Sequence, residues 1–136
     1  MGHVRCSYRE LVSKMKRILI VDDAATVRMY HRNILEAAGY NVDEAVNGIE
    51  ALEKALQESF QLYVVDINMP KLDGYGFLRE LRAQDMFQAP AIMISTEAEA
   101  DDLKRAYVAG ANAYLVKPVK PDQLLIQVKL LLGDAG

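Results

Sequence analysis

The chain of 136 residues contains 16 Lys and Arg against 19 Asp and Glu, a formal net charge of −3, and 51% of its residues are hydrophobic. This length predicts one globular domain, and the composition excludes a disordered or fibrous chain. The slightly acidic charge, and the lack of a basic stripe interleaved with aromatic residues, argue against direct binding to nucleic acid.

Cysteine and histidine are too scarce for two common kinds of site. Cys6 has no partner for an intrachain disulfide, and His3 and His31 cannot form a zinc site alone. No apolar run is long enough to cross a membrane, and the charged N-terminal segment lacks the apolar core of a signal peptide. We therefore expect no membrane insertion and a cytoplasmic location.

Residues 1–14 precede the regular pattern of the chain, and MKRILIVDD from Met15 would itself make a natural beginning. We divide the chain into this N-terminal extension, whose role is left open, and one domain over 15–136. Apolar residues of the extension recur at helical spacing, which also allows a helix that docks on the domain or on a partner.

Five short apolar runs follow, and each is succeeded by a segment with helical periodicity. The expected strands are RILIV, NVDEA, LYVVD, AIMIS and AYLVK, and the expected helices cover 24–38, 47–59, 73–84, 98–109 and 121–132. Regular alternation of strands and helices predicts an α/β fold with a parallel sheet and helices on both faces. The nearly continuous apolar runs suit central strands, whereas the more polar NVDEA suits a position nearer an edge.

Polar side chains stand where four of these strands end. In chain order they are Asp22, Asp23, Asp66, Ser95, Thr96 and Lys117. The carboxyl ends of parallel strands share one edge of a sheet, where functional residues gather. Each residue alone can be explained as a helix cap or a solvated loop residue. Together, however, three carboxylates would repel one another unless a cation lay among them.

The combination points to phosphoryl chemistry. Mg²⁺ prefers oxygen ligands and commonly binds one or two carboxylates together with a phosphate oxygen. The ammonium of Lys117 and the hydroxyl of Ser95 would supply charge and a hydrogen bond to phosphoryl oxygens. A carboxylate between two cations can act as the nucleophile toward phosphorus. Asp66 is therefore the central candidate for phosphorylation, with Mg²⁺ as the cofactor.

The motifs ILIVDD, VVDINMPKLDG, MIST and YLVKP occur in this order between Lys16 and the C-terminus. This ordered set resembles the receiver domain of bacterial two-component response regulators. The resemblance implies a flavodoxin-like, doubly wound sheet of five parallel strands in the order 2-1-3-4-5. It also implies a phosphoaccepting signalling domain rather than an enzyme acting on an external substrate.

The resemblance assigns a role to each polar residue at the strand ends. Asp66 becomes the phosphoacceptor and a metal ligand, Asp23 holds Mg²⁺ directly, and Asp22 does so largely through water. The backbone carbonyl of Asn68 completes the metal ligands. Lys117 pairs with Asp66 and then with the phosphoryl group, and its peptide bond to the following proline is expected to be cis.

Four further residues are assigned to signalling in the same way. Ser95 supplies the switch hydroxyl, and Tyr114 is expected to turn inward when Ser95 is drawn to the phosphate. The surface of the fourth helix, fifth strand and fifth helix then binds a downstream protein. Asn68 and Glu97 match the pair that permits rapid self-dephosphorylation in the chemotaxis receiver, so we predict a short-lived phosphoryl state.

Three functions remain in competition at this level. The first is a stand-alone receiver of the chemotaxis type, phosphorylated by a sensor histidine kinase, although Glu99 and Ala100 replace lysines of the motor-binding protein. The second is a phosphorelay intermediate that passes its phosphate to a histidine phosphotransfer protein. The third, a phosphatase of the haloacid-dehalogenase type, requires a second acid where Asn68 stands. We expect His31 to be a surface or partner-contact residue.

Overall fold

The computed structural model describes residues 16–134, which form one parallel sheet with the strand order β2-β1-β3-β4-β5. The strands are β1 (Arg17–Val21), β2 (Asn41–Ala45), β3 (Leu62–Asp66), β4 (Ala91–Ser95) and β5 (Ala113–Val116). The predicted fold class and strand order are confirmed. The N-terminal extension over 1–14 lies outside the described residues, so its proposed helix stays a prediction.

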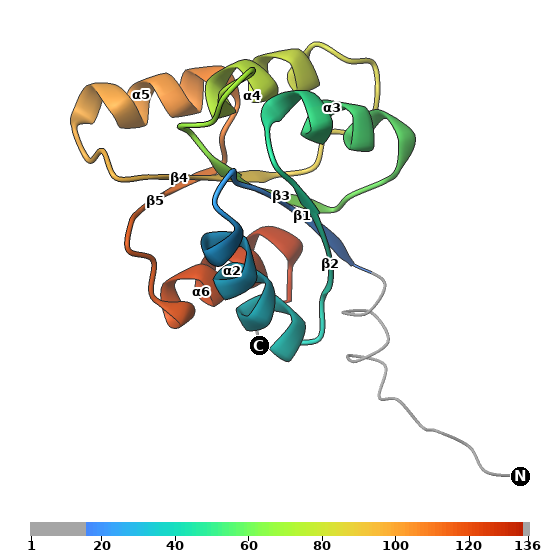
Figure 1. The fold of residues 1–136 in the computed structure, drawn as a ribbon, viewed down its shortest axis with the longest axis vertical. Coiled ribbons are helices and arrows are strands. Elements are labelled where there is room, and N and C mark those ends of the chain that lie inside the picture. The colour runs from blue at the N-terminus through green and yellow to red at the C-terminus, as the bar shows by residue number, and fades with distance from the viewer. Residues whose placement is uncertain (1–15, 135–136) are drawn as a thin grey trace, which may run out of the picture.

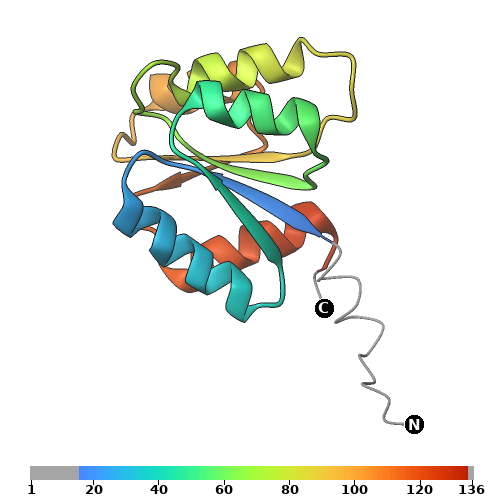
Figure 2. The same ribbon diagram turned by 45° about the vertical axis from the view of Figure 1, so that its right-hand side comes forward.

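Five helices cover the two faces of this sheet. They are α2 (Ala25–Ala37), α3 (Gly48–Gln57), α4 (Gly74–Arg82), α5 (Ala100–Ala109) and α6 (Pro121–Leu132). Figures 1 and 2 show α3, α4 and α5 on one face and α2 and α6 on the other. Within residues 16–134, none of these helices has the length and apolar character that a membrane span requires.

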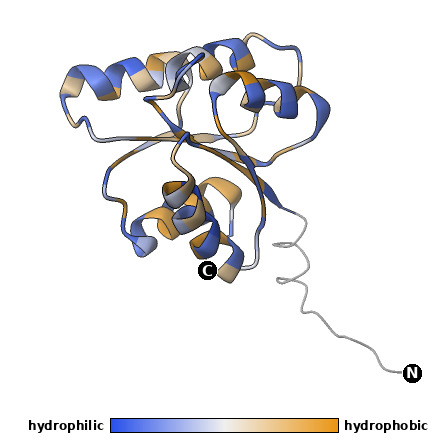
Figure 3. Cartoon of the chain, in the orientation of Figure 1, coloured by the Kyte–Doolittle hydropathy of each residue, from blue (hydrophilic) through white to orange (hydrophobic). Residues whose placement is uncertain are grey.

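The core consists of two layers because successive strand residues point to opposite faces. In β3, Tyr63 and Val65 pack under α3, α4 and α5, whereas Leu62 and Val64 pack against α2 and α6. All five residues of β3 are buried, as are all five of β4. In Figure 3 the hydrophobic colour accordingly lies along the sheet and α6, while α5 is largely hydrophilic.

The strand β2 lies at an edge, as its polar sequence predicts. Asn41 is exposed and Asp43 and Glu44 are half-buried, whereas Val42 and Ala45 are buried. An edge strand has one neighbour only, so its polar residues reach solvent at low cost.

The register of the strands brings their carboxyl ends to one level. Val21 of β1 pairs with Val65, Asp66 pairs with Ile94, and Ser95 pairs with Val116. The residues that follow these positions therefore meet at a single edge of the sheet, as the rule for open parallel sheets requires.

The fourth predicted helix begins two residues later than expected, at Ala100 instead of 98. The segment before it forms a loop in which the hydroxyl of Ser95 accepts a hydrogen bond from the amide of Glu97, at 3.1 Å. Such a local bond between a serine side chain and the backbone competes with helix formation. The loop therefore keeps Ser95 and Glu97 beside the end of β4.

Candidate phosphorylation site

Asp66 lies at the end of β3, whose five residues are all buried, and Lys117 reaches it from the end of β5. Asp66 is 6% exposed. The ammonium nitrogen Nζ of Lys117 lies 3.1 Å from Oδ1 of Asp66 and 3.5 Å from Oδ2 of Asp22. The Lys117–Pro118 peptide bond is cis, as the resemblance implied. One cation thus contacts two buried carboxylates that come from two different strand ends.

A third carboxylate completes the cluster. Asp22, Asp23 and Asp66 each have a carboxylate oxygen within 4.8 Å of the other two. Asp22 is 2% exposed, and its Oδ1 accepts a hydrogen bond from the amide of Ala24 at 2.9 Å, whereas Asp23 is exposed to solvent. Since Lys117 is the single ammonium that contacts the cluster among residues 16–134, two negative charges remain in excess. Oxygen donors with this surplus charge fit a hard divalent cation such as Mg²⁺.

The electrostatics of the site follow from burial and from these neighbours. Burial raises the pKa of Asp66, the charge of Asp22 raises it further, and the ammonium of Lys117 opposes both effects. For Lys117, burial by itself would lower the pKa. The hydrogen bond to Asp66 and the charge of Asp22 outweigh this, so the pKa of Lys117 is raised. The lysine is therefore held in its charged form.

The loop after β3 lies beside the cluster. Asn68 is exposed there, and no hydrogen bond within residues 16–134 occupies its backbone oxygen. The loop ends at Gly74, the first residue of α4, whose amide donates to the carbonyl of Ile67 just after β3, at 2.9 Å. A Cβ atom at Gly74 would lie 2.7 Å from the backbone oxygen of Asp66, so only glycine allows this close approach.

The two predicted switch residues, Ser95 and Tyr114, both form a hydrogen bond with the backbone of Glu97. The hydroxyl of Ser95 accepts from the amide of Glu97, and the hydroxyl of Tyr114 donates to the carbonyl of the same Glu97 at 2.7 Å. Ser95 is 1% exposed, whereas Tyr114 is half-buried. Sequence reasoning placed both residues near the site but missed this connection, because a hydrogen bond to a loop carbonyl leaves no mark in side-chain identity.

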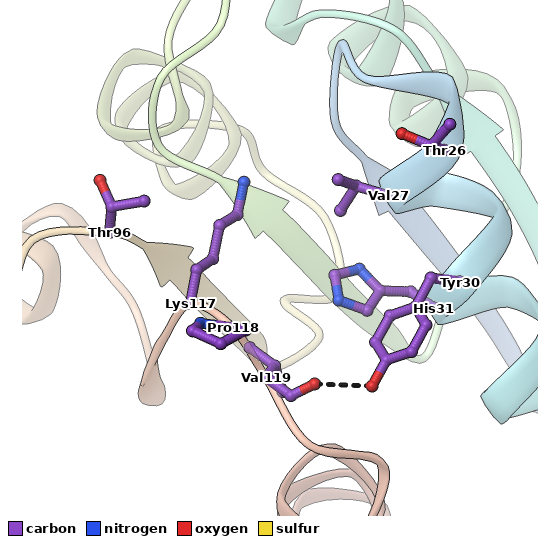
Figure 4. Close-up of a pocket in the computed structure, with 8 residues that line it drawn as sticks. All are labelled: Thr26, Val27, Tyr30, His31, Thr96, Lys117, Pro118 and Val119. Carbon is purple, nitrogen blue, oxygen red and sulfur yellow. Dashed lines mark hydrogen bonds between the residues drawn. The ribbon is translucent and has the colours of Figure 1, made fainter.

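The expectation for His31 is wrong, because its side chain is 3% exposed and lies inside the fold. It stands one helical turn after Val27 and one turn before Leu35, on the face of α2 that packs on the sheet. The spacing of these three residues could have revealed its position, but the polarity of histidine suggested the surface. Figure 4 shows the His31 ring and Lys117 on opposite walls of a pocket.

Comparison with known proteins agrees with this geometry. Residues 18–129 match the family model described as the response regulator receiver domain. The transcriptional regulatory protein ResD of Bacillus subtilis is 37% identical over 120 residues, which are 88% of this chain and 49% of ResD. This chain spans about half the length of the curated relatives that it matches.

Solved structures of receivers share the fold. The chemotaxis response regulator CheY4 of Vibrio cholerae superposes with a TM-score of 0.82 and 34% identity, covering 87% of this chain and 99% of CheY4. The receiver domain of the sensor histidine kinase PA1611 of Pseudomonas aeruginosa has a TM-score of 0.81 and 31% identity, covering 87% of this chain and 98% of that domain. The PA1611 structure has a magnesium ion coordinated in its active-site cleft.

Proposed function

Because this chain belongs to the response regulator receiver domain family, we propose that it accepts a phosphoryl group on Asp66 from a histidine kinase, with Mg²⁺ as cofactor. The contact that carries this proposal is the 3.1 Å approach of the Lys117 ammonium to Oδ1 of Asp66 inside a cluster of three carboxylates. In such a site the surplus carboxylates can bind a metal ion, and the ammonium can bind a phosphoryl oxygen.

The carboxylates of Asp22, Asp23 and Asp66 and the backbone carbonyl of Asn68 would hold the metal. When bound, Mg²⁺ neutralises phosphoryl oxygens and thereby favours attack on phosphorus. An Oδ atom of Asp66 then attacks the phosphorus of a phosphohistidine. The new O–P bond forms as the N–P bond breaks, and the imidazole leaves with the electron pair. Lys117 pairs with a phosphoryl oxygen in place of Oδ1.

The conformational signal begins at Ser95. A phosphoryl group adds roughly 1.5 to 2 negative charges beside its hydroxyl, and a hydroxyl that turns toward them gives up the amide of Glu97. Tyr114 holds the carbonyl of the same residue, so the loop and the tyrosine rearrange together. This rearrangement changes the population of conformers on the surface of α5, β5 and α6.

That surface is our proposed contact for a downstream protein. It carries exposed apolar side chains, which include Val108 at 80% exposed, Tyr107 at 49% and Val116 at 40%. Apolar side chains of this kind can supply contacts to a bound protein. The sensor kinase and this target are the two partners in the proposal, which places the protein in the cytoplasm as a signalling domain rather than an enzyme.

Within this family we favour a chemotaxis-type receiver with rapid self-dephosphorylation. Asn68 and Glu97 are both exposed on the loops that flank Asp66, where they can orient an attacking water. The alternative, a phosphorelay intermediate, draws support from the similarity to receivers of sensor kinases such as PA1611. A phosphoryl group that persists for hours in the purified protein with Mg²⁺ would favour the relay.

The test is phosphorylation by acetyl phosphate with Mg²⁺, followed by intact-protein mass spectrometry. We expect one phosphoryl group on the wild type and none on Asp66→Ala. Asp43→Ala, which removes a half-buried carboxylate of β2 outside the cluster, is the matched control and should be phosphorylated as the wild type is. Phosphate uptake by Asp66→Ala would overturn the site assignment.

A further inference from the structure

A pocket of about 380 Å³ lies between the first turns of α2 and the loop that joins β5 to α6. Its lining residues come from α2, from the end of β4 and from that loop, and are Thr26, Val27, Tyr30, His31, Thr96, Lys117, Pro118 and Val119. This volume is in the range of pockets that bind small molecules. Its lining surface is mostly apolar.

The two walls of the pocket are held together. The hydroxyl of Tyr30 donates to the backbone carbonyl of Val119 at 2.9 Å, as Figure 4 shows. Val119 is 4% exposed and packs into the core between the sheet and α6. This bond fixes Tyr30 against the opposite wall, so a ligand would need little rearrangement of that part of the pocket.

The His31 ring is the polar group that this pocket leaves without a protein partner. No hydrogen bond within residues 16–134 involves its imidazole, although the residue is only 3% exposed. In the same part of the chain, every side-chain nitrogen or oxygen that is sealed from solvent has a partner. An imidazole nitrogen is therefore reached from the pocket, where it can exchange a hydrogen bond with a ligand.

The charged side chains beside the pocket disfavour both anionic and cationic ligands. Burial lowers the pKa of His31, and Lys117 lowers it further against an opposing effect of Asp22, so the ring is neutral and offers one donor and one acceptor. The charge of Lys117 is already balanced by Asp66 and Asp22. An anionic ligand would meet these carboxylates, and a cationic one would meet the ammonium.

We propose that this pocket binds a small neutral molecule with a flat apolar body and one N–H or O–H group, which hydrogen-bonds to His31. The proposal goes beyond the phosphoacceptor function and does not depend on it. Lys117 lines the pocket and contacts Asp66, so an occupied pocket changes the rate at which Asp66 is phosphorylated. This coupling, unlike the binding itself, rests on the proposed function.

The binding test uses indole as the probe on the full chain, without phosphodonor or Mg²⁺, so that its failure is separate from any failure of the phosphorylation site. We expect saturable chemical-shift changes in two-dimensional NMR spectra, confined to α2 and the loop after β5. Indene has the same shape without the N–H, and should bind about fivefold more weakly, which is the effect of losing one ordinary hydrogen bond. Indole-3-acetate, an anion, should also bind more weakly than indole.

Two variants locate the site. Thr26→Trp fills the pocket from an exposed position on α2 and should weaken indole binding at least tenfold, whereas Asn33→Trp, which is exposed on the same helix outside the pocket, should leave it unchanged. His31→Leu should reduce the preference for indole over indene to near unity. Absence of saturable shifts in the wild type, or equal binding by both tryptophan variants, would overturn the proposal. So would a preference for indole that survives in His31→Leu.

The coupling is tested by labelling with acetyl phosphate and Mg²⁺ at saturating indole. We expect the rate of phosphorylation of the wild type to change by at least about twofold, which corresponds to roughly 0.4 kcal/mol in activation free energy. The rate for Thr26→Trp should not respond to indole. A wild-type rate that is unaffected by bound indole would overturn the coupling.

Discussion

Two charged clusters of this domain differ in their burial and in their balance of charge. On the outer side of α2 and β2, Arg28 and Arg32 share the carboxylate of Glu44, and Arg32 also pairs with Glu36. These groups are partly exposed, and the charges balance. At the carboxyl edge of the sheet, one lysine faces the buried Asp66 and Asp22.

The difference distinguishes a structural ion-pair network from a functional site. Exposed, balanced pairs cost little and contribute little to stability. Buried carboxylates in excess of their cations lower stability, and such a cluster persists where binding of a further cation compensates it. The candidate site therefore differs from the other cluster in having buried carboxylates that outnumber their cations. The number of charged residues alone would not distinguish it from the cluster on α2 and β2.

The largest expected effect comes from removing one cation from each cluster. Lys117→Met leaves Asp66 and Asp22 without a cation, and should lower the free energy of unfolding by about 3 kcal/mol in the absence of metal. Arg32→Met should lower it by less than about 1 kcal/mol, because its partners are solvated. Urea denaturation at neutral pH measures both. Equal losses in the two variants would remove the distinction between the clusters.

Metal binding should affect the carboxylate cluster alone. Mg²⁺ at about 100 times its dissociation constant should raise the free energy of unfolding of the wild type by about 2.7 kcal/mol. The gain should disappear in Asp23→Asn and return to baseline with a chelator, whereas Glu44→Gln should keep it in full. Thermal denaturation over a magnesium series provides the measurement. A gain in Asp23→Asn as large as in the wild type would place the metal elsewhere.

The loop after β3 should be more sensitive to added volume than the end of the last helix. Gly74→Ala places a methyl group against the backbone of Asp66, and should cost about 2 kcal/mol and slow phosphorylation. Gly133→Ala meets no atom within 4 Å, but its φ is +74°, so we expect a cost of about 1 kcal/mol and unchanged phosphorylation. Denaturation and acetyl phosphate labelling check the two effects. Normal labelling of a destabilised Gly74→Ala would contradict the role of this contact.

The smallest effect concerns His31 and pH. Its pKa is lowered in the fold by burial, so between that value and the unfolded value near 6.5 the unfolded chain binds more protons. The stability contributed is full above about pH 6.5 and is lost as the pH falls toward the folded pKa, by at most about 1.4 kcal/mol per pH unit. In His31→Leu, the free energy of unfolding should lack this dependence on pH. Urea denaturation of both proteins from pH 7.5 to 5.5 provides the measurement. A parallel pH dependence in both proteins would contradict it.

Much of the site could be predicted because strand ends are local features of the chain. Asp22, Asp66 and Lys117 each directly follow or end an apolar run, and parallel strands carry such positions to one edge. The contacts that the sequence did not reveal connect elements that are far apart in it. Examples are the bond from Tyr114 to the carbonyl of Glu97 and the bond from Tyr30 to the carbonyl of Val119.

By itself, the sequence determined the fold class, the strand order through its family motifs, and the residues of the candidate phosphorylation site. Its periodicity and strand ends are properties of neighbouring residues, which any chain with this pattern would share. The tertiary structure alone decided that His31 is buried, that a pocket lies beside Lys117, and that Ser95 and Tyr114 both bond to the backbone of Glu97. These features depend on how helices and loops pack on the sheet, and packing depends on the shapes of side chains brought together from distant parts of the chain.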